Sequence, residues 1–179
     1  MRTALLAALL LAAPEPRMGP RLQPPAELPA ALQPALHRAE EAIRAAACEA
    51  ERRFGEGDPD ANASHCQGAA PVRGVEVGRT SARLRNPGNA PPRWARAYVA
   101  ATDGRKAAEV PAVAFDLGDR VGLLRPVEIR KRCLACHAPR QELDEDTRDW
   151  LASAYPRDRA LGYALGDLRG FWWAEAPAR

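Results

Sequence analysis

The chain has little lysine, few histidines and few aromatic residues, and its excess of positive charge is small. It carries 26 basic and 23 acidic residues, which give a formal net charge of +3 at pH 7. A balance this close to neutral does not support nucleic-acid binding, which relies on a concentrated basic surface. Lys106 and Lys131 are the only lysines. Nearly all the basic residues are therefore arginines, a bias to which we give no functional weight.

Long hydrophobic runs are also scarce, and the one such run lies at the start of the chain. Arg2 is followed by an uninterrupted apolar stretch from Ala4 to Ala13. This stretch is shorter than the roughly 20 apolar residues that a membrane-spanning helix needs. We therefore predict that residues 1–13 are a cleavable secretory signal, with an uncleaved tether as the alternative. The expected location is the bacterial periplasm or another exported site, with no membrane span after cleavage.

Prolines concentrate in the segment that follows the apolar run. Six of them lie between Pro14 and Pro29, and proline interrupts helical hydrogen bonding. We predict a proline-rich flexible linker over residues 14–29. Residues 30–179 contain no internal repeat and no second long hydrophobic block, so they are expected to form a single domain.

The predicted domain is α+β, a small antiparallel sheet flanked by helices. Residues 30–54 are rich in Ala, Leu, Glu and Arg, with apolar positions at helical spacing, and predict a long N-terminal helix that ends near Gly55. Two strands separated by Gly118-Asp119 predict an antiparallel hairpin, although Pro111 weakens the start of the first strand. The remaining predicted elements are strands over 75–80 and 168–174, helices over 93–101 and 142–154, and hairpin strands over 110–117 and 121–130.

The most informative motif follows the second hairpin strand, where residues 133–137 read CLACH. In a CxxCH segment, two cysteines can each bond to a haem vinyl group while the adjacent histidine binds the iron. A thioredoxin-like disulfide needs a βαβ context, and a zinc site needs two further ligands at close spacing. Neither context is evident here. We therefore predict one covalent haem c attached to Cys133 and Cys136, with His137 as the proximal iron ligand.

Four further strings in the chain support this interpretation. Residues 78–91 read GRTSARLRNPGNAP, residues 124–126 read LRP, residues 155–163 read YPRDRALGY and residues 166–170 read GDLRG. Together with the CxxCH motif, they resemble the Tll-like c-type haem-binding family, catalogued as a domain of unknown function. The resemblance implies a PAS-like fold with one haem c. Some members of that family stand alone, and others form the extracytoplasmic part of signalling receptors.

The resemblance also implies a distal iron ligand, a cysteine on the N-terminal helix that matches Cys48. The four cysteines leave other possibilities open, because haem attachment uses two and leaves Cys48 and Cys66 as a pair. In an exported protein, this pair is a candidate disulfide, and Cys48 is alternatively a small buried thiol. His65 is the alternative distal ligand. His37 lies about 16 Å from Cys48 along the helix, so both cannot reach one iron.

Two arginines in the first shared string, Arg79 and Arg83, are candidate contacts for the haem propionates. A guanidinium pairs with a carboxylate through two parallel hydrogen bonds. The alternative is that these arginines decorate a solvated strand or turn. Trp172 and Trp173 are expected to serve as packing residues.

The sequence contains no catalytic constellation, so we do not expect an enzyme, although peroxidase-like activity at an open distal site is not excluded. No nucleophile has a neighbouring base, and no glycine-rich loop is suited to phosphate. Two functions remain: a sensor of redox state or small gases, and a soluble periplasmic electron carrier. Both require a redox or signalling partner that the sequence does not identify.

Overall fold

The structure is a computed structural model that describes residues 21–54, 66 and 69–179. It confirms the predicted α+β class, with a long N-terminal helix and an antiparallel sheet of five strands in the order β1-β3-β4-β5-β2. The strands are β1 (Arg21–Gln23), β2 (Glu76–Thr80), β3 (Val113–Asp116), β4 (Arg120–Glu128) and β5 (Leu168–Pro177). The α-helices are α1 (Gln33–Phe54), α2 (Arg96–Ala101), α3 (Leu134–His137) and α4 (Glu145–Ala154).

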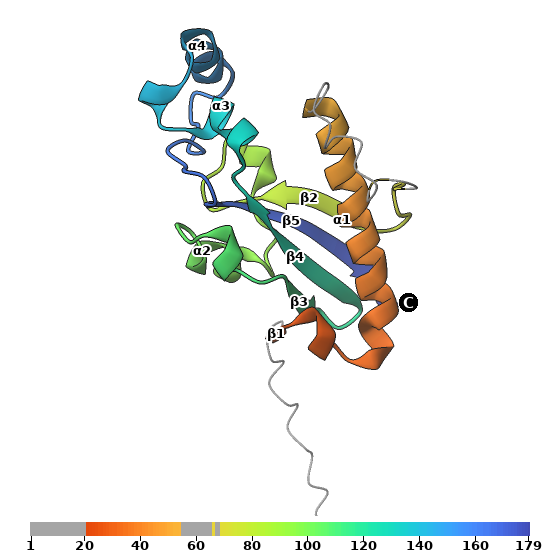
Figure 1. Ribbon diagram of the computed structural model, residues 1–179. Helices are drawn as coiled ribbons and strands as arrows, with labels where there is room; N and C mark the ends of the chain where they lie inside the picture. The colour runs from red at the N-terminus through yellow and green to blue at the C-terminus, as the bar shows by residue number, and fades with distance from the viewer. Residues whose placement is uncertain (1–20, 55–65, 67–68) are drawn as a thin grey trace, which may run out of the picture.

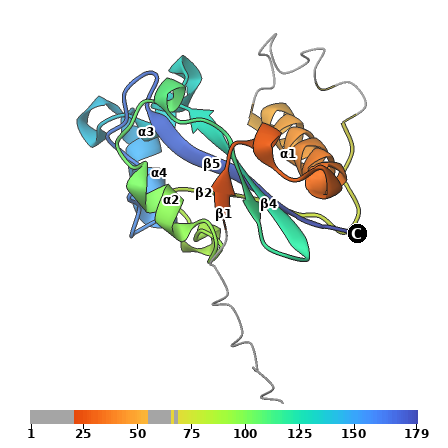
Figure 2. The ribbon, with the colours of Figure 1, turned by 90° about the horizontal axis from the view of Figure 1, so that it is seen from below.

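Helix α1 lies across one face of the sheet and α2 lies on the opposite face (Figures 1 and 2). The buried side of α1 carries small and branched residues, including Ala35, Ala39 and Ile43. Because alanine has the smallest apolar side chain, it lets the helix backbone approach the strands closely. These residues form one hydrophobic cluster with Val121 and Leu123 of β4, together with Ala174 and Ala176 of β5. The long helix is therefore held by apolar burial rather than by helix propensity alone.

A second cluster fills the other face of the sheet. The ring of Phe115 on β3 lies 4.9 Å from that of Trp94, centroid to centroid. Phe171 on β5 lies 5.7 Å from Tyr98 of α2. Leu124 of β4 is fully buried in the same cluster. The sheet is thus covered on both faces, as the alternation of side chains along β4 and β5 requires.

The predicted hairpin is confirmed as β3 and β4. Gly118 adopts a positive φ of 90° at the turn, and the Asp116 carboxylate accepts a hydrogen bond of 2.8 Å from the Gly118 amide. A positive φ of this size favours glycine, which has no Cβ. Strand β3 begins at Val113, after Pro111, because proline cannot donate to a strand ladder.

Two sequence predictions need correction. Part of the predicted linker belongs to the fold: β1 pairs with β3 at the edge of the sheet, and Leu28 is buried in the α1 cluster. Proline is tolerated here because Pro25 begins a short 3-10 turn, where no amide hydrogen is needed. The predicted closing strand over 168–174 is longer than expected, extending to Pro177, and it lies between β4 and β2. The predicted signal, residues 1–13, lies outside the described residues.

The described helices include none with the length and apolar character required to cross a membrane.

Candidate haem-attachment site

The CxxCH segment lies at one end of the sheet, directly after β4. A 3-10 turn, Lys131–Cys133, leads into the single-turn helix α3. Cys133 and Cys136 are free thiols and both are partly exposed. In Figure 1 the C-terminal part of α1 and helix α3 stand at the same end of the sheet. Accessible thiols at a helix turn suit covalent attachment of a group that binds alongside them.

The imidazole of His137 is held in one orientation by the backbone. Its Nδ1 lies 2.7 Å from the carbonyl oxygen of Ala160, to which it donates a hydrogen bond. With the ring proton on Nδ1, the lone pair of Nε2 is available to a metal. Burial lowers the pKa of His137 from 6.5 to about 4, and the positive charge of Arg169 acts in the same direction. The neutral imidazole that iron requires is therefore the form that this fold stabilises at neutral pH.

Arg85 and Asp158 position the carbonyl that holds His137. Arg85 Nε donates to the Asp158 carboxylate at 2.9 Å, and both side chains are largely buried. Asp158 also accepts a 2.7 Å hydrogen bond from the Ala160 amide, and Arg85 donates to the carbonyl of Cys136. A buried pair with these additional hydrogen bonds is well satisfied. This ion pair links two segments that are far apart in the sequence, residues 78–91 and 155–163, to the helix α3 that carries the CxxCH motif.

Arg169, at the start of β5, lies against the metal-binding side of His137. Its Nε is 3.4 Å from His137 Nε2, and its Nη1 donates to the hydroxyl of Ser81 at 3.0 Å. The guanidinium is 5.5 Å from the ring centre of Tyr163. Burial lowers the pKa of Arg169. Within the described ranges it forms no ion pair with a carboxylate.

Arg79, on β2 at the same end of the sheet, is an exposed residue. Its guanidinium lies 5.1 Å from the ring centre of Trp172, its direct partner across the β2–β5 ladder. Desolvation by the neighbouring residues lowers the pKa of Arg79, and the Cys133 sulfur opposes that change. Arg79 too has no carboxylate partner in the part of the chain that the structure describes.

Arg83, the other predicted propionate contact, is engaged by the protein itself. Its guanidinium lies over the Tyr163 ring at 3.8 Å, 3.5 Å from the Asp103 carboxylate. It also donates to the carbonyl of Leu161 at 3.3 Å. A role for Arg79 or Arg83 toward a propionate stays a prediction.

Cys48, predicted as the distal iron ligand, is in a disulfide with Cys66 in this structure, with their Cα atoms 5.6 Å apart. A disulfide sulfur has no thiolate to donate to iron. The pairing is the alternative that the cysteine count left open, and the oxidised form of Cys48 does not serve as a ligand. His65, the alternative distal ligand, lies outside the described residues. His37 is exposed and lies 3.6 Å from Glu41.

Helix α1 nevertheless presents Cys48 toward the end of the sheet that carries the motif. Cys48 is 1% exposed and follows Ile43 by little more than one turn on the buried side of α1. One turn further on, Glu51 lies 3.6 Å from Arg132, the residue before Cys133. The C-terminal part of α1, which carries Cys48, therefore lies near the CxxCH segment.

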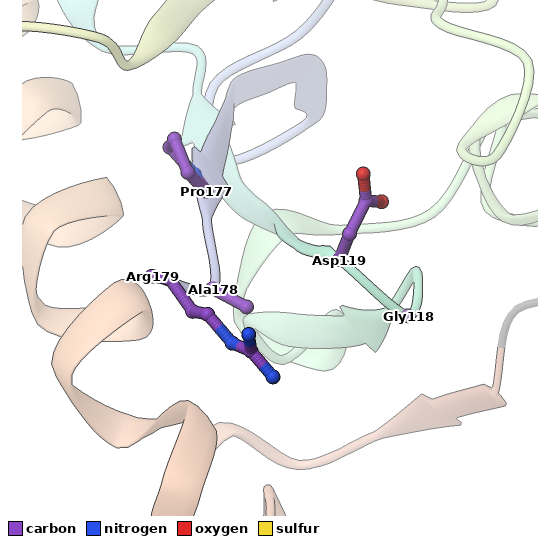
Figure 3. Close-up of a pocket in the computed structure, with 5 residues that line it drawn as sticks. All are labelled: Gly118, Asp119, Pro177, Ala178 and Arg179. Carbon is purple, nitrogen blue, oxygen red and sulfur yellow. The ribbon is translucent and has the colours of Figure 1, made fainter.

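A shallow hollow at the chain's C-terminal end has no part in this site. Residues 118–119 of the hairpin turn and 177–179 line it, and the Asp119 side chain points away from Arg179 (Figure 3). No group of three His, Cys, Asp or Glu residues suited to a metal ion occurs among the residues placed by the structure.

Two of the residues that shape the site were missed by the sequence analysis: Tyr163 and Arg169. Both lie in the shared strings, which marked these segments but did not tell which side chains face His137. Their contacts join segments far apart in the chain.

Fold and site together define the class: an α+β domain with two free thiols and an oriented, buried histidine at one end of its sheet. The chain belongs to the Tll0287-like family, whose model matches residues 33–177. It is also similar to a solved structure, "Crystal structure of the cyanobacterial heme-protein Tll0287", at 26% identity and a TM-score of 0.48. The match covers 59% of this chain and 62% of that one. No curated protein sequence matches this chain.

Proposed function

We propose that this domain is an exported monohaem c-type cytochrome domain that senses redox state or a small gas. Cys133 and Cys136 form thioether bonds to one haem, and His137 is an axial ligand. The observation that carries the proposal is the hydrogen bond from His137 Nδ1 to Ala160, which puts the ring proton on Nδ1 and leaves the Nε2 lone pair as the one that could bind iron. In the structure Arg169 Nε lies 3.4 Å from Nε2. Family membership supports the haem, because the related solved structure is titled a haem protein. When bound, the haem supplies a one-electron couple and a site for diatomic gases.

The chain's own residues determine how the proximal side behaves. The Ala160 carbonyl fixes the tautomer of His137, and the ion pair of Arg85 with Asp158 fixes Ala160. Burial of the imidazole keeps it neutral and limits access of water to the iron side. A rigid proximal ligand favours signalling changes on the distal side, where α1 lies.

Cys48 gives this domain a distal side with two chemical states. In the oxidised state its sulfur is bonded to Cys66. Two electrons and two protons from a dithiol reductant, which itself becomes a disulfide, convert this bond into two thiols. The Cys48 thiol would then be able to release its proton to solvent and bind the haem iron as a thiolate, which with His137 would give the ligand pair that the family resemblance implies. Because Cys48 is part of α1, each state packs this helix differently, as a PAS-like sensor would require.

Intact mass spectrometry tests haem attachment. The exported chain, produced with a c-type haem maturation system, is expected to carry the mass of one haem. The Cys133→Ala/Cys136→Ala variant is expected to carry none. A wild-type chain without added mass after maturation would contradict the proposal.

Electron paramagnetic resonance tests the distal ligand. Ferric wild-type protein treated with a dithiol is expected to show a low-spin thiolate signature that is absent from Cys48→Ala. The Cys66→Ser variant is expected to show this signature without reductant. If Cys66→Ser and Cys48→Ala give the same spectrum, Cys48 is not a ligand.

A soluble periplasmic electron carrier is the second candidate, and the disulfide favours it. If Cys48 stays bonded to Cys66, no thiolate is available to leave the iron, and constant coordination favours fast electron transfer. Carbon monoxide distinguishes the two: a sensor binds it after reduction and a carrier does not. We expect no enzyme activity, and the redox or signalling partner is still to be identified.

A further inference from the structure

We propose that the haem packs between Trp172 of β5 and a group of three alanines near the C-terminal end of α1. The alanines are Ala46, Ala47 and Ala50. This surface lies on the α1 face of the sheet, at the end that carries the CxxCH motif. The inference rests on the proposed function and names the protein surface that covers the attached cofactor.

The sheet-facing side of α1 changes from closed to open along the helix. Ala39 and Ile43 lie on this side and are 0% and 3% exposed. The three alanines follow Ile43 by three, four and seven residues, so they share its side of the helix. All three are nevertheless partly exposed. The contact between α1 and the sheet is therefore incomplete over the last turns of the helix.

Trp172 shows the same change on the sheet. Ala176 and Ala174 of β5 are fully buried on the α1 face. Trp172 is the next residue of β5 on that face and is only partly buried, although β5 lies inside the sheet between β4 and β2. Its cross-strand neighbours, Arg125 and Arg79, are both exposed. A large aromatic ring on an inner strand thus keeps part of its surface open beside a helix that covers the rest of the row.

The open surface borders the attachment segment on both sides. On the helix side, the Glu51 carboxylate at the same end of α1 lies 3.6 Å from Arg132, the residue before Cys133. On the sheet side, β4 pairs with Trp172 at Arg125 and leads directly into the turn that ends at Cys133. A flat group bonded to Cys133 can therefore reach the alanines and the indole ring together.

The chemistry of the two walls matches the apolar face of a porphyrin. An indole ring packs favourably against another aromatic system in offset or edge-on geometry. Alanine ends in a single methyl group, so a helix lined with alanines can approach a flat ring closely. Burial of the remaining apolar surface stabilises the loaded state, because that surface otherwise faces water.

Trp173, the next residue of β5, supplies the matched control. Its side chain lies on the opposite face of the sheet, where it packs against the α2 cluster. A Cβ added at Gly78 would lie 2.8 Å from its indole nitrogen, so the chain itself already covers this ring. The haem is therefore expected to contact Trp172 and not Trp173.

The first test is hydroxyl-radical oxidation followed by mass spectrometry of the peptides. It compares protein whose haem attachment is verified by mass with the haem-free Cys133→Ala/Cys136→Ala variant. Rates are expressed relative to Trp150, which is 58% exposed on α4. We expect Trp172 to oxidise several-fold more slowly in the haem-loaded protein, and Trp173 to oxidise at the same relative rate in both.

The second test is circular dichroism in the Soret band, which reports aromatic rings that couple to the haem. Trp172→Phe is expected to change the amplitude of this band, and Trp173→Phe to leave it unchanged. Ala47→Leu is expected to shift the Soret maximum, because the added methyl groups would meet the haem. Ala152→Leu, at an exposed position on α4, is expected to have no effect.

Equal relative oxidation of Trp172 in the two forms, whether fast or slow, overturns the packing alone. An unchanged Soret band in haem-loaded Trp172→Phe overturns it too. Wild-type protein that carries no haem overturns the proposed function as well.

Discussion

The two ends of the interface between α1 and the sheet are built from different residues. At one end, successive cross-strand pairs on the α1 face are apolar, first Val121 with Ala176 and then Leu123 with Ala174. One step further along the same face, the row is Arg125, Trp172 and Arg79 across β4, β5 and β2. The face changes from apolar to cationic within a single repeat of the strand.

This difference agrees with the proposed position of the haem at the end of the sheet that carries the CxxCH motif. The apolar end is closed by Ala39, Ile43 and the alanines of β5. At the cationic end, Arg125 pairs with Glu40, whereas Arg79 has no carboxylate partner among the described residues. Apolar burial stabilises the first end, whereas both arginines of the second end are exposed.

The largest expected effect on the free energy of unfolding comes from a substitution at Gly170, where β5 packs closely against β2 at the cationic end. Gly170→Ala is expected to cost about 4 kcal/mol or more, because the added Cβ would lie 2.2 Å from the Thr80 carbonyl oxygen. Gly74→Ala is the matched control: its φ is also positive, at 74°, but nothing lies within 4 Å of the added Cβ. We expect that control to cost about 1 kcal/mol. Urea unfolding measures both, and equal losses would contradict the close packing at Gly170.

Substitutions in two neighbouring rows of β4 compare the stability that each end contributes. Leu123 is fully buried, and Leu123→Ala is expected to cost about 3 kcal/mol by removing packed methyl groups. Arg125 is half exposed and lies 3.4 Å from Glu40, so Arg125→Ala is expected to cost less than about 1 kcal/mol. Denaturant midpoints test the contrast. If Arg125→Ala costs as much as Leu123→Ala, the cationic row is a structural element in its own right.

A further expected effect on stability, smaller than that of Leu123→Ala, is a pH dependence at the cationic end. The pKa of His137 is lowered from 6.5 to about 4 in the fold, so between these values the unfolded chain binds a proton that the folded chain does not. Stability from this group is therefore complete above pH 6.5 and is lost as the pH falls toward 4. Partial exposure reduces the expected loss to about 2 kcal/mol.

The measurement is urea unfolding at pH 4.5 and pH 7 in the haem-free Cys133→Ala/Cys136→Ala variant. His137→Asn added to this background is expected to remove that part of the pH dependence. If the slope of stability with pH is the same with and without His137, the imidazole is not held neutral by burial.

The sequence predicted much of the fold because the signals were local. The helical spacing from Leu36 to Ala47, the turn at Gly118 and the effect of Pro111 each act within a few residues. The CxxCH motif is local too. The surroundings of the arginines are not determined locally. Arg79 contacts Trp172 through the register of β2 with β5, and Arg85 contacts Asp158 through the packing of distant loops. The cysteine count allowed both states of Cys48, and the structure shows its bond to Cys66.

The position of the haem tests the central claim most directly. Ferric haem is paramagnetic and broadens the nuclear magnetic resonance signals of nearby amides. Comparison of the holoprotein with the haem-free Cys133→Ala/Cys136→Ala variant is expected to show broadening at Arg79, His137 and Arg169, with sharp signals retained at Val121 and Ala176. Broadening at Val121 and Ala176, with sharp signals at the arginines, would contradict the assignment of the haem to the cationic end.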